Sequence, residues 1–134
     1  WGSLRPLIPH VDLWLYDIKE LDPRRHERFV GKSNELILEN LKRLHDADAK
    51  IVIRCPMIPQ HNARERFLDD LVQLAKQLPR IQGIELLPYY DLWRAKLKRF
   101  GLTTKLPTSV KPPSTATVES WREHLRSQGV RVIG

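Results

Sequence analysis

Cysteine is almost absent from this 134-residue sequence, which contains only Cys55. A single thiol excludes an internal disulfide framework and any cluster of cysteine ligands supplied by this chain alone. The sequence also lacks an apolar run of membrane-spanning length, and no signal peptide is visible. Because the chain begins at Trp1 rather than Met, we expect a longer parent protein. With a single cysteine and no visible signal peptide, the expected location is the cytoplasm.

Acidic residues are in the minority: 16 Asp and Glu stand against 23 Lys and Arg, which gives a net charge of +7. Such an excess is typical of proteins that bind nucleic acid or anionic surfaces. Here no basic run alternates with aromatic residues, and solvated helix faces account for most of the excess. A basic RNA-binding domain is therefore the weakest interpretation. The basic residues form three groups: Arg24, Arg25 and Arg28; Arg94, Lys96, Lys98 and Arg99; and Arg122, Arg126 and Arg131.

Hydrophobic residues make up 41% of the chain, enough for the core of one domain spanning residues 1–134. Apolar periodicity and capping residues predict alternating strands and helices. Strands are expected at 11–16, 50–54, 84–87 and 130–133. Helices are expected at 23–31, from 33 or 34 onward, and at 64–78, 92–100 and 115–127. The segment 103–114 is rich in Pro, Thr and Ser, and it is expected to be irregular.

Alternating strand and helix units are typical of an α/β fold with a parallel sheet and right-handed crossovers. The strand ends at Asp17, Arg54 and Pro88 recur at about 35 residues, an ordinary period for such units. The chain would fill about half of an eight-unit barrel, so either a small open sheet or part of a larger barrel is indicated. In the second case, helices should cover one face of the strands, and the other face or an edge should stay partly apolar.

Asp17 and Lys19 stand at the end of the first predicted strand. Residues two apart project from the same face of a strand. In parallel α/β sheets and barrels, ligands bind at the carboxyl ends of the strands. An acid and a base side by side at such an end would suit a zwitterion. On this stretch alone, however, a surface ion pair of little energetic value is favoured.

Three blocks of residues follow one another along the chain. The first is Asp17-Ile18-Lys19 with His26, Gly31, Ser33-Asn34 and Glu39-Asn40-Leu41; the second is Ile53-Arg54 with Ile58-Pro59; the third is Glu85-Leu86-Leu87-Pro88-Tyr89 with Gly101 and Val110-Lys111-Pro112-Pro113. In this order and spacing, they resemble the C-terminal half of the radical S-adenosylmethionine activating proteins of glycyl-radical enzymes, the pyruvate formate-lyase activase group.

The resemblance implies the C-terminal half of a partial (β/α)6 TIM-like barrel that binds S-adenosylmethionine. By position, Asp17 and Lys19 would hold the methionine part of the cofactor, and Asp17 could also share a monovalent cation with the cofactor carboxylate. Arg54 would contact the cofactor from the next strand end. Tyr90 occupies the place of a cofactor-contacting His in the family; a phenol can hydrogen-bond or stack, but it does not titrate near neutral pH.

A second departure from the family lies in the loop from Ile58 to Ala63. The family continues its Ile-Pro-Gly loop to an Asn-Asp pair, whereas this sequence reads Ile-Pro-Gln-His-Asn-Ala, which indicates a different loop path. His26 is interpreted as structural, and Cys55 as a small apolar side chain rather than a ligand. No catalytic residue and no metal ligand is assigned to this chain.

The resemblance also implies an N-terminal half, absent from this chain, in which a Cys-x3-Cys-x2-Cys loop holds a 4Fe-4S cluster. With that half, the parent would be a radical S-adenosylmethionine oxidoreductase that uses a 5′-deoxyadenosyl radical to form a glycyl radical on a partner enzyme. This chain would supply part of the cofactor site but no cluster ligands. The alternative is a non-catalytic half-barrel module that binds a nucleotide-like ligand or a protein.

Overall fold

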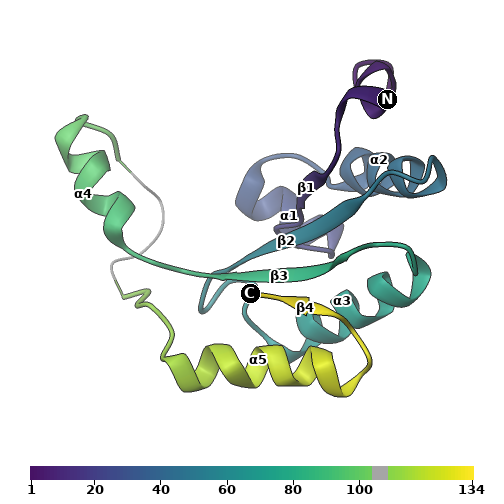
Figure 1. The fold of residues 1–134 in the computed structure, drawn as a ribbon. Coiled ribbons are helices and arrows are strands. Elements are labelled where there is room, and N and C mark those ends of the chain that lie inside the picture. The colour runs from purple at the N-terminus through teal and green to yellow at the C-terminus, as the bar shows by residue number, and fades with distance from the viewer. Residues whose placement is uncertain (104–108) are drawn as a thin grey trace.

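The computed structural model describes residues 1–103 and 109–134, with the elements arranged as in Figure 1. The strands are β1 (Trp14–Asp17), β2 (Ile51–Met57), β3 (Gly83–Pro88) and β4 (Val132–Ile133). The helices are the 3-10 helix η1 (Arg5–His10) and the α-helices α1 (Pro23–Val30), α2 (Glu35–Asp46), α3 (Glu65–Gln77), α4 (Leu92–Arg99) and α5 (Thr115–Ser127). Within the segment 103–114 that was expected to be irregular, residues 104–108 lie outside the described residues.

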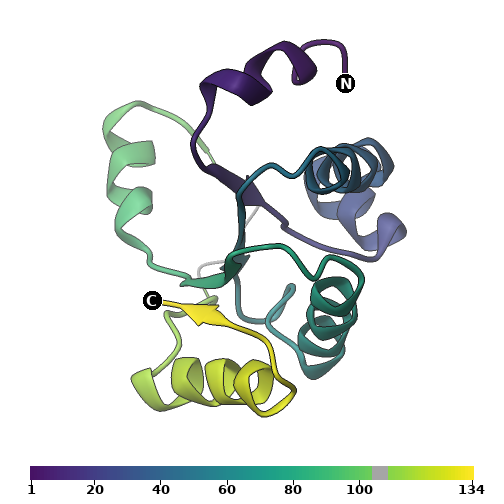
Figure 2. The same ribbon diagram turned by 45° about the vertical axis from the view of Figure 1, so that its right-hand side comes forward.

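The four strands are parallel and pair in the order β1-β2-β3-β4. The prediction of an α/β fold with parallel strands is therefore confirmed. Helices α2, α3 and α5 lie on one side of the sheet (Figure 2), while α4 lies apart from them, beyond the carboxyl end of β3 (Figure 1). Because the strands are parallel, the carboxyl ends of β1, β2 and β3 meet at the same end of the sheet.

The core fills the space between the sheet and this helix layer. Alternate residues of β2 face the helices and are buried: Ile51, Ile53, Cys55 and Met57. The helices contribute buried side chains at helical spacing, namely Leu41, Leu44, Phe67, Leu71 and Leu125. Full burial of such a side chain contributes roughly 1.5–3 kcal/mol, so this layer accounts for much of the stability of the fold.

The opposite face of the sheet is much less covered. By register, Leu15 of β1 lies beside Val52 of β2, and two residues further along the strands, on the same face, Asp17, Arg54 and Glu85 form a row. Leu15 is 56% exposed, although it sits on a sheet face. A partly apolar open face agrees with the expectation for part of a larger barrel.

The first α-helix begins and ends at the residues predicted from the sequence. Asp22 is the N-cap of α1 and accepts a hydrogen bond from the Arg25 N–H at 3.0 Å, with Pro23 at the first helical position. Gly31 ends the helix with a φ of 85°, in the left-handed region that glycine adopts without a steric penalty. Since α1 starts here, the short segment 18–22 has to cross the carboxyl end of the sheet.

Strand β2 runs further than predicted. The sequence predicted an end at Arg54 and a break at Pro56, but β2 continues to Met57, with Pro56 opposite Leu87 of β3. In a central strand of a parallel sheet, the main-chain groups of successive residues bond in turn to the strand on one side and to the strand on the other. Pro56 faces the β1 side, where the ladder has already ended with the bond from the Ile18 N–H to the Arg54 carbonyl. The missing N–H of the proline therefore interrupts no bond between β2 and β3.

Candidate functional site

An exposed ion pair stands at the end of β1. Asp17 is the last residue of the strand, and its Oδ2 lies 3.7 Å from the Nζ of Lys19. The Lys19 and Asp17 side chains are 52% and 44% exposed. A pair this open to water contributes only about 0–1 kcal/mol to stability. Both charges are therefore free to bind a ligand at small cost in folding free energy.

Arg54 and Glu85 extend the charged row across the sheet. The register sets Asp17 beside Arg54, and Arg54 beside Glu85. The Nε of Arg54 lies 3.1 Å from the Oε2 of Glu85, and the two side chains are 33% and 32% exposed. These atoms are close but not aligned as a hydrogen bond, so the buried Nε–H has no hydrogen-bond acceptor among the described residues. Because a guanidinium has five N–H donors, Arg54 keeps donor capacity for a ligand.

Tyr90 follows β3, at the same end of the sheet as Asp17. Its side chain is 63% exposed. The neighbouring Tyr89 is buried instead, and its hydroxyl accepts a hydrogen bond from the Nε of Arg94 at 3.2 Å. The sheet thus brings Asp17 and Arg54 together, while Tyr90 stands on the segment beyond β3 and outside the strand row.

Glu20 is a buried carboxylate directly after the ion pair, and sequence reasoning missed it. Its side chain is 2% exposed and accepts hydrogen bonds from both terminal nitrogens of Arg64, at 2.7 and 2.9 Å, and from the Nε of Arg25, at 3.1 Å. Burial by itself would raise the pKa of Glu20, but the hydrogen bonds from Arg64, the Asp22 N–H and Arg25, with the charge of Arg64, lower it below its usual value. Arg64 is 44 residues away in sequence, so no local pattern indicates the pair.

Asn62 is a second buried polar residue, in the loop between β2 and α3. Its Nδ2 donates to the carbonyls of Lys19, at 2.8 Å, and Pro56, at 2.6 Å, while its Oδ1 accepts from the Ile58 N–H at 2.7 Å. Sequence reasoning did not single out Asn62, because its partner Lys19 lies 43 residues away in sequence. The different loop path inferred from the sequence stays a prediction.

His26 and Cys55 are both buried. The Nδ1 of His26, on α1, lies 2.7 Å from the Lys32 carbonyl oxygen, a contact that joins the helix to the segment after it. Cys55 is 0% exposed within the core, and burial raises the pKa of its thiol. A protonated thiol among apolar side chains is a poor metal ligand. Both side chains therefore lie in the protein interior, and their structural interpretation stays a prediction.

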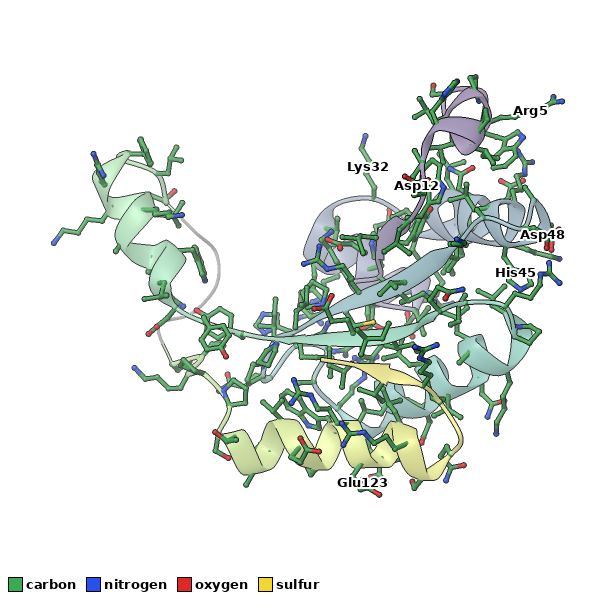
Figure 3. The ribbon with its side chains drawn as sticks, viewed as in Figure 1. Arg5, Asp12, Lys32, His45, Asp48 and Glu123 are labelled. Atoms are coloured by element: carbon green, nitrogen blue, oxygen red, sulfur yellow. The ribbon has the colours of Figure 1, made fainter. Side chains whose placement is uncertain are left out.

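A different polar cluster lies at the opposite end of the sheet. His45, near the end of α2, and Asp48 beyond it (Figure 3) both contact Arg80, which donates to the His45 carbonyl at 2.8 Å and pairs with Asp48 at 2.9 Å. The amino ends of the strands lie here, so this cluster is remote from Asp17. Within residues 1–103 and 109–134, no three metal-ligating side chains gather into a site. No helix in the same ranges has both the length and the hydropathy that a membrane crossing requires.

Comparison with known proteins identifies relatives that match most of the chain. It is 31% identical over 132 residues, or 98% of its length, to the indoleacetate decarboxylase activating enzyme of Tractidigestivibacter scatoligenes. It is 31% identical over 127 residues, or 95% of its length, to the pyruvate formate-lyase 1-activating enzyme of Escherichia coli (strain K12). Over 88 residues, 64% of the chain, it is 42% identical to the trans-4-hydroxy-L-proline dehydratase activating enzyme of Clostridioides difficile. No protein-family model matches the chain.

The chain spans only part of these relatives: 41% of the first, 51% of the second and 29% of the third. Among solved structures, a domain of pyruvate-formate lyase-activating enzyme from Bacteroides vulgatus ATCC 8482 matches with a TM-score of 0.78 and 27% identity. That match covers 98% of this chain and 72% of the solved one. The resemblance inferred from the three sequence blocks is therefore confirmed.

Proposed function

We propose that this chain is the C-terminal half of a radical S-adenosylmethionine activase, because its homologues are activating enzymes of glycyl-radical enzymes. In this role the carboxyl ends of β1, β2 and β3 form one side of the cofactor site. The rest of the partial barrel, with a Cys-x3-Cys-x2-Cys loop and its 4Fe-4S cluster, would lie in the part of the protein beyond this chain. The chain's only cysteine, the buried Cys55, supports this division.

The charges at the end of the sheet fit the methionine part of S-adenosylmethionine. Lys19 and Arg54 would bind its carboxylate, and Asp17 would bind its ammonium group, its sulfonium or a monovalent cation shared with the carboxylate. Tyr90 would lie against the ribose or the adenine. The exposure of the Asp17–Lys19 pair at the carboxyl end of β1 supports this fit.

Glu85 adds a feature that the sequence-derived site did not contain. Because it lies against Arg54, part of the guanidinium charge is balanced before any ligand arrives. A ligand carboxylate would therefore use the remaining N–H donors of Arg54, while Lys19 supplies the less balanced positive charge. We therefore expect removal of the Lys19 charge to weaken binding of the cofactor carboxylate more than removal of the Arg54 charge does.

When bound, the cofactor and the cluster would supply the one-electron chemistry that forms a glycyl radical on a partner enzyme by way of a 5′-deoxyadenosyl radical. The residues of this chain would orient the cofactor and leave its reactive end toward the other half of the barrel. The partner would be a glycyl-radical enzyme. A cytoplasmic location suits the single cysteine, which is free and buried.

The observation that carries this proposal is the charged row at the carboxyl ends of β1, β2 and β3. In the complete protein, Lys19→Ala or Asp17→Ala should weaken S-adenosylmethionine binding by roughly 1–3 kcal/mol, because each change leaves a charged group of the ligand unpaired. Tyr90→Phe should weaken binding less, because the aromatic ring and its stacking remain. Isothermal titration calorimetry under anaerobic conditions measures each affinity.

Matched controls come from the amino ends of the same strands. Lys50 and Asp12 are exposed residues that precede β2 and β1, so Lys50→Ala and Asp12→Ala remove the same charges at the far end of the sheet. Both variants should bind S-adenosylmethionine with an affinity within about twofold of that of the unaltered protein, as surface changes outside a site do. If Asp17→Ala binds the cofactor as tightly as Asp12→Ala, the assignment of the site is wrong.

A further inference from the structure

The main chain of Lys19 is held by a side chain from the next loop. Asn62 is 4% exposed, and its Nδ2 lies 2.8 Å from the Lys19 carbonyl oxygen and 2.6 Å from that of Pro56. Both hydrogens of the amide are used in this way, and its Oδ1 accepts the Ile58 N–H at 2.7 Å. One buried amide thus makes three hydrogen bonds, all of them to main-chain groups.

This amide lies where the ladder between β1 and β2 stops. The last bond of the ladder runs from the Ile18 N–H to the Arg54 carbonyl at 2.8 Å. One step further, Pro56 has no N–H to donate, so the regular ladder cannot continue. The side chain of Asn62 bridges the two segments there instead. The main chain at Lys19 is therefore tied to β2, although it lies beyond the end of β1.

The same loop also holds the residue after Lys19. The carboxylate of Glu20 is bound by Arg64, which stands at the start of α3, and the Nη2 of Arg25 donates to the His61 carbonyl at 2.5 Å. In contrast, the Lys19 side chain itself is 52% exposed. A fixed main chain thus carries an ammonium group that stays open to a ligand.

We infer that Asn62 is a positioning residue for Lys19 in the candidate cofactor site. Asn62 sets the place of the Lys19 peptide, and through it the reach of the Lys19 ammonium toward the carboxylate of S-adenosylmethionine. This inference rests on the proposed function of the site. Asn62 contacts no ligand in this assignment, so its effect on binding passes through Lys19.

The test replaces Asn62 with a residue of the same size that cannot donate. In Asn62→Asp the acceptor for the Ile58 N–H remains, but a carboxylate faces the carbonyls of Lys19 and Pro56 in place of two N–H donors. Of the two lost bonds, only the one to the Lys19 carbonyl acts on the cofactor site. In the complete protein with its cluster, we therefore expect the Kd for S-adenosylmethionine to rise roughly tenfold, the ratio for about 1.4 kcal/mol. The KM for the cofactor should rise with it, while kcat at saturating cofactor should change by less than about threefold, because the lost contact acts on binding.

Two comparisons separate positioning from general destabilisation. Asn34 is also buried, and its Nδ2 likewise donates to two carbonyls, those of Glu20 and Leu21 at 2.9 Å each, but it does not contact Lys19. Asn34→Asp should therefore lower the melting temperature without raising the Kd more than about twofold. A double-mutant cycle provides the second comparison: in a Lys19→Ala background, Asn62→Asp should add less than about twofold to the Kd, because the group that it positions is gone.

The outcomes are distinct. A tenfold effect of Asn62→Asp that disappears in the Lys19→Ala background supports the inference. Asn62 is not a positioning residue if Asn62→Asp and Asn34→Asp raise the Kd equally. The same conclusion follows if Asn62→Asp raises the Kd by the full tenfold in the Lys19→Ala background. In either case the proposed cofactor site still stands. If the unaltered protein fails to bind S-adenosylmethionine, the proposed function and this inference are both wrong.

Discussion

The segment after β1 depends on one buried carboxylate. Besides its two arginine partners, Glu20 accepts hydrogen bonds from the Leu21 N–H at 2.9 Å and the Asp22 N–H at 3.1 Å. Because these groups bind the charged form, the pKa of Glu20 in the folded protein lies below its usual 4.5 despite burial. The unfolded chain then binds more protons than the folded one, so the stabilisation is present above pH 4.5 and is lost as the pH falls through the folded-state pKa.

Glu20→Gln tests this dependence. The substitution leaves the guanidinium of Arg64 without its anionic partner, so the free energy of unfolding should fall by about 3 kcal/mol at neutral pH. Urea unfolding at about pH 7 and about pH 3.5 should show a smaller loss of stability on acidification in the variant than in the unaltered protein, because the proton-linked group has been removed. Glu27→Gln, an exposed change on α1, should stay within about 0.5 kcal/mol at both pH values. An equal acid dependence in the Glu20→Gln protein would contradict this account.

The positions of individual candidate-site residues in the fold were predictable where their signal is local. Asp17 and Lys19 could be placed at a strand end because residues two apart share a face, and Arg54 could be aligned with them because the strand period sets its position. Glu20 and Asn62 could not be found in this way. Their partners Arg64 and Lys19 lie 44 and 43 residues away, and only the packing of two loops brings them together.

Strands β3 and β4 meet across a glycine that leaves no room for a side chain. Gly83 has a φ of 147°, and a Cβ there would lie 2.7 Å from the Arg131 carbonyl oxygen and 3.0 Å from a side-chain carbon of Ile133. Gly83→Ala should lower the free energy of unfolding by about 3 kcal/mol, because a strained backbone and a close contact with main chain act together. Denaturant unfolding of the variant measures this difference.

Gly31→Ala is the matched control for backbone strain alone. Gly31 also has a positive φ, of 85°, but a Cβ there would meet nothing within 4 Å. The cost should therefore be about 1 kcal/mol, the ordinary penalty for alanine in the left-handed region. If the two glycine variants lose the same stability, the contact with Arg131 has no role in the cost at Gly83.

At the scale of elements, prediction succeeded where capping chemistry and apolar spacing agree. Helix α5 spans Thr115–Ser127 as predicted, and its N-cap Ser114 accepts a hydrogen bond from the Thr117 N–H at 3.1 Å. Ser33 or Asn34 was expected to cap α2. The Oγ of Ser33 accepts the Glu35 N–H at 3.3 Å, whereas the side chain of Asn34, at the N-cap position, makes no capping bond and binds the carbonyls of Glu20 and Leu21 instead. The side chain of Asn34 therefore makes tertiary hydrogen bonds in place of the capping bond that its residue type favours. The start of β1, expected at residue 11 and found at Trp14, and the end of β2, expected at Arg54 and found at Met57, were misplaced, since pairing with neighbours decides where a strand begins and ends.

The whole molecule is a parallel sheet with helices on one side and a partly open face on the other (Figure 2). Sequence periodicity predicted the parallel units, because each strand and its following helix carry their own signals. It left open whether the sheet stands alone or forms part of a barrel, because periodicity within one segment carries no signal of how many strands the complete sheet has. The exposed Leu15 and the charged row on the same face agree with the proposal that this sheet is part of a barrel.

The 134-residue chain by itself should hold no iron–sulfur cluster. Purified and reconstituted with iron and sulfide under anaerobic conditions, it should show no charge-transfer absorption of a 4Fe-4S cluster and no reductive cleavage of S-adenosylmethionine. The reason is that a site-differentiated cluster needs three thiolates, and the chain offers one buried thiol whose pKa is raised by burial. The complete protein, treated in parallel, should show both. Stoichiometric cluster binding by the isolated chain would contradict the division of the site between two halves of a barrel.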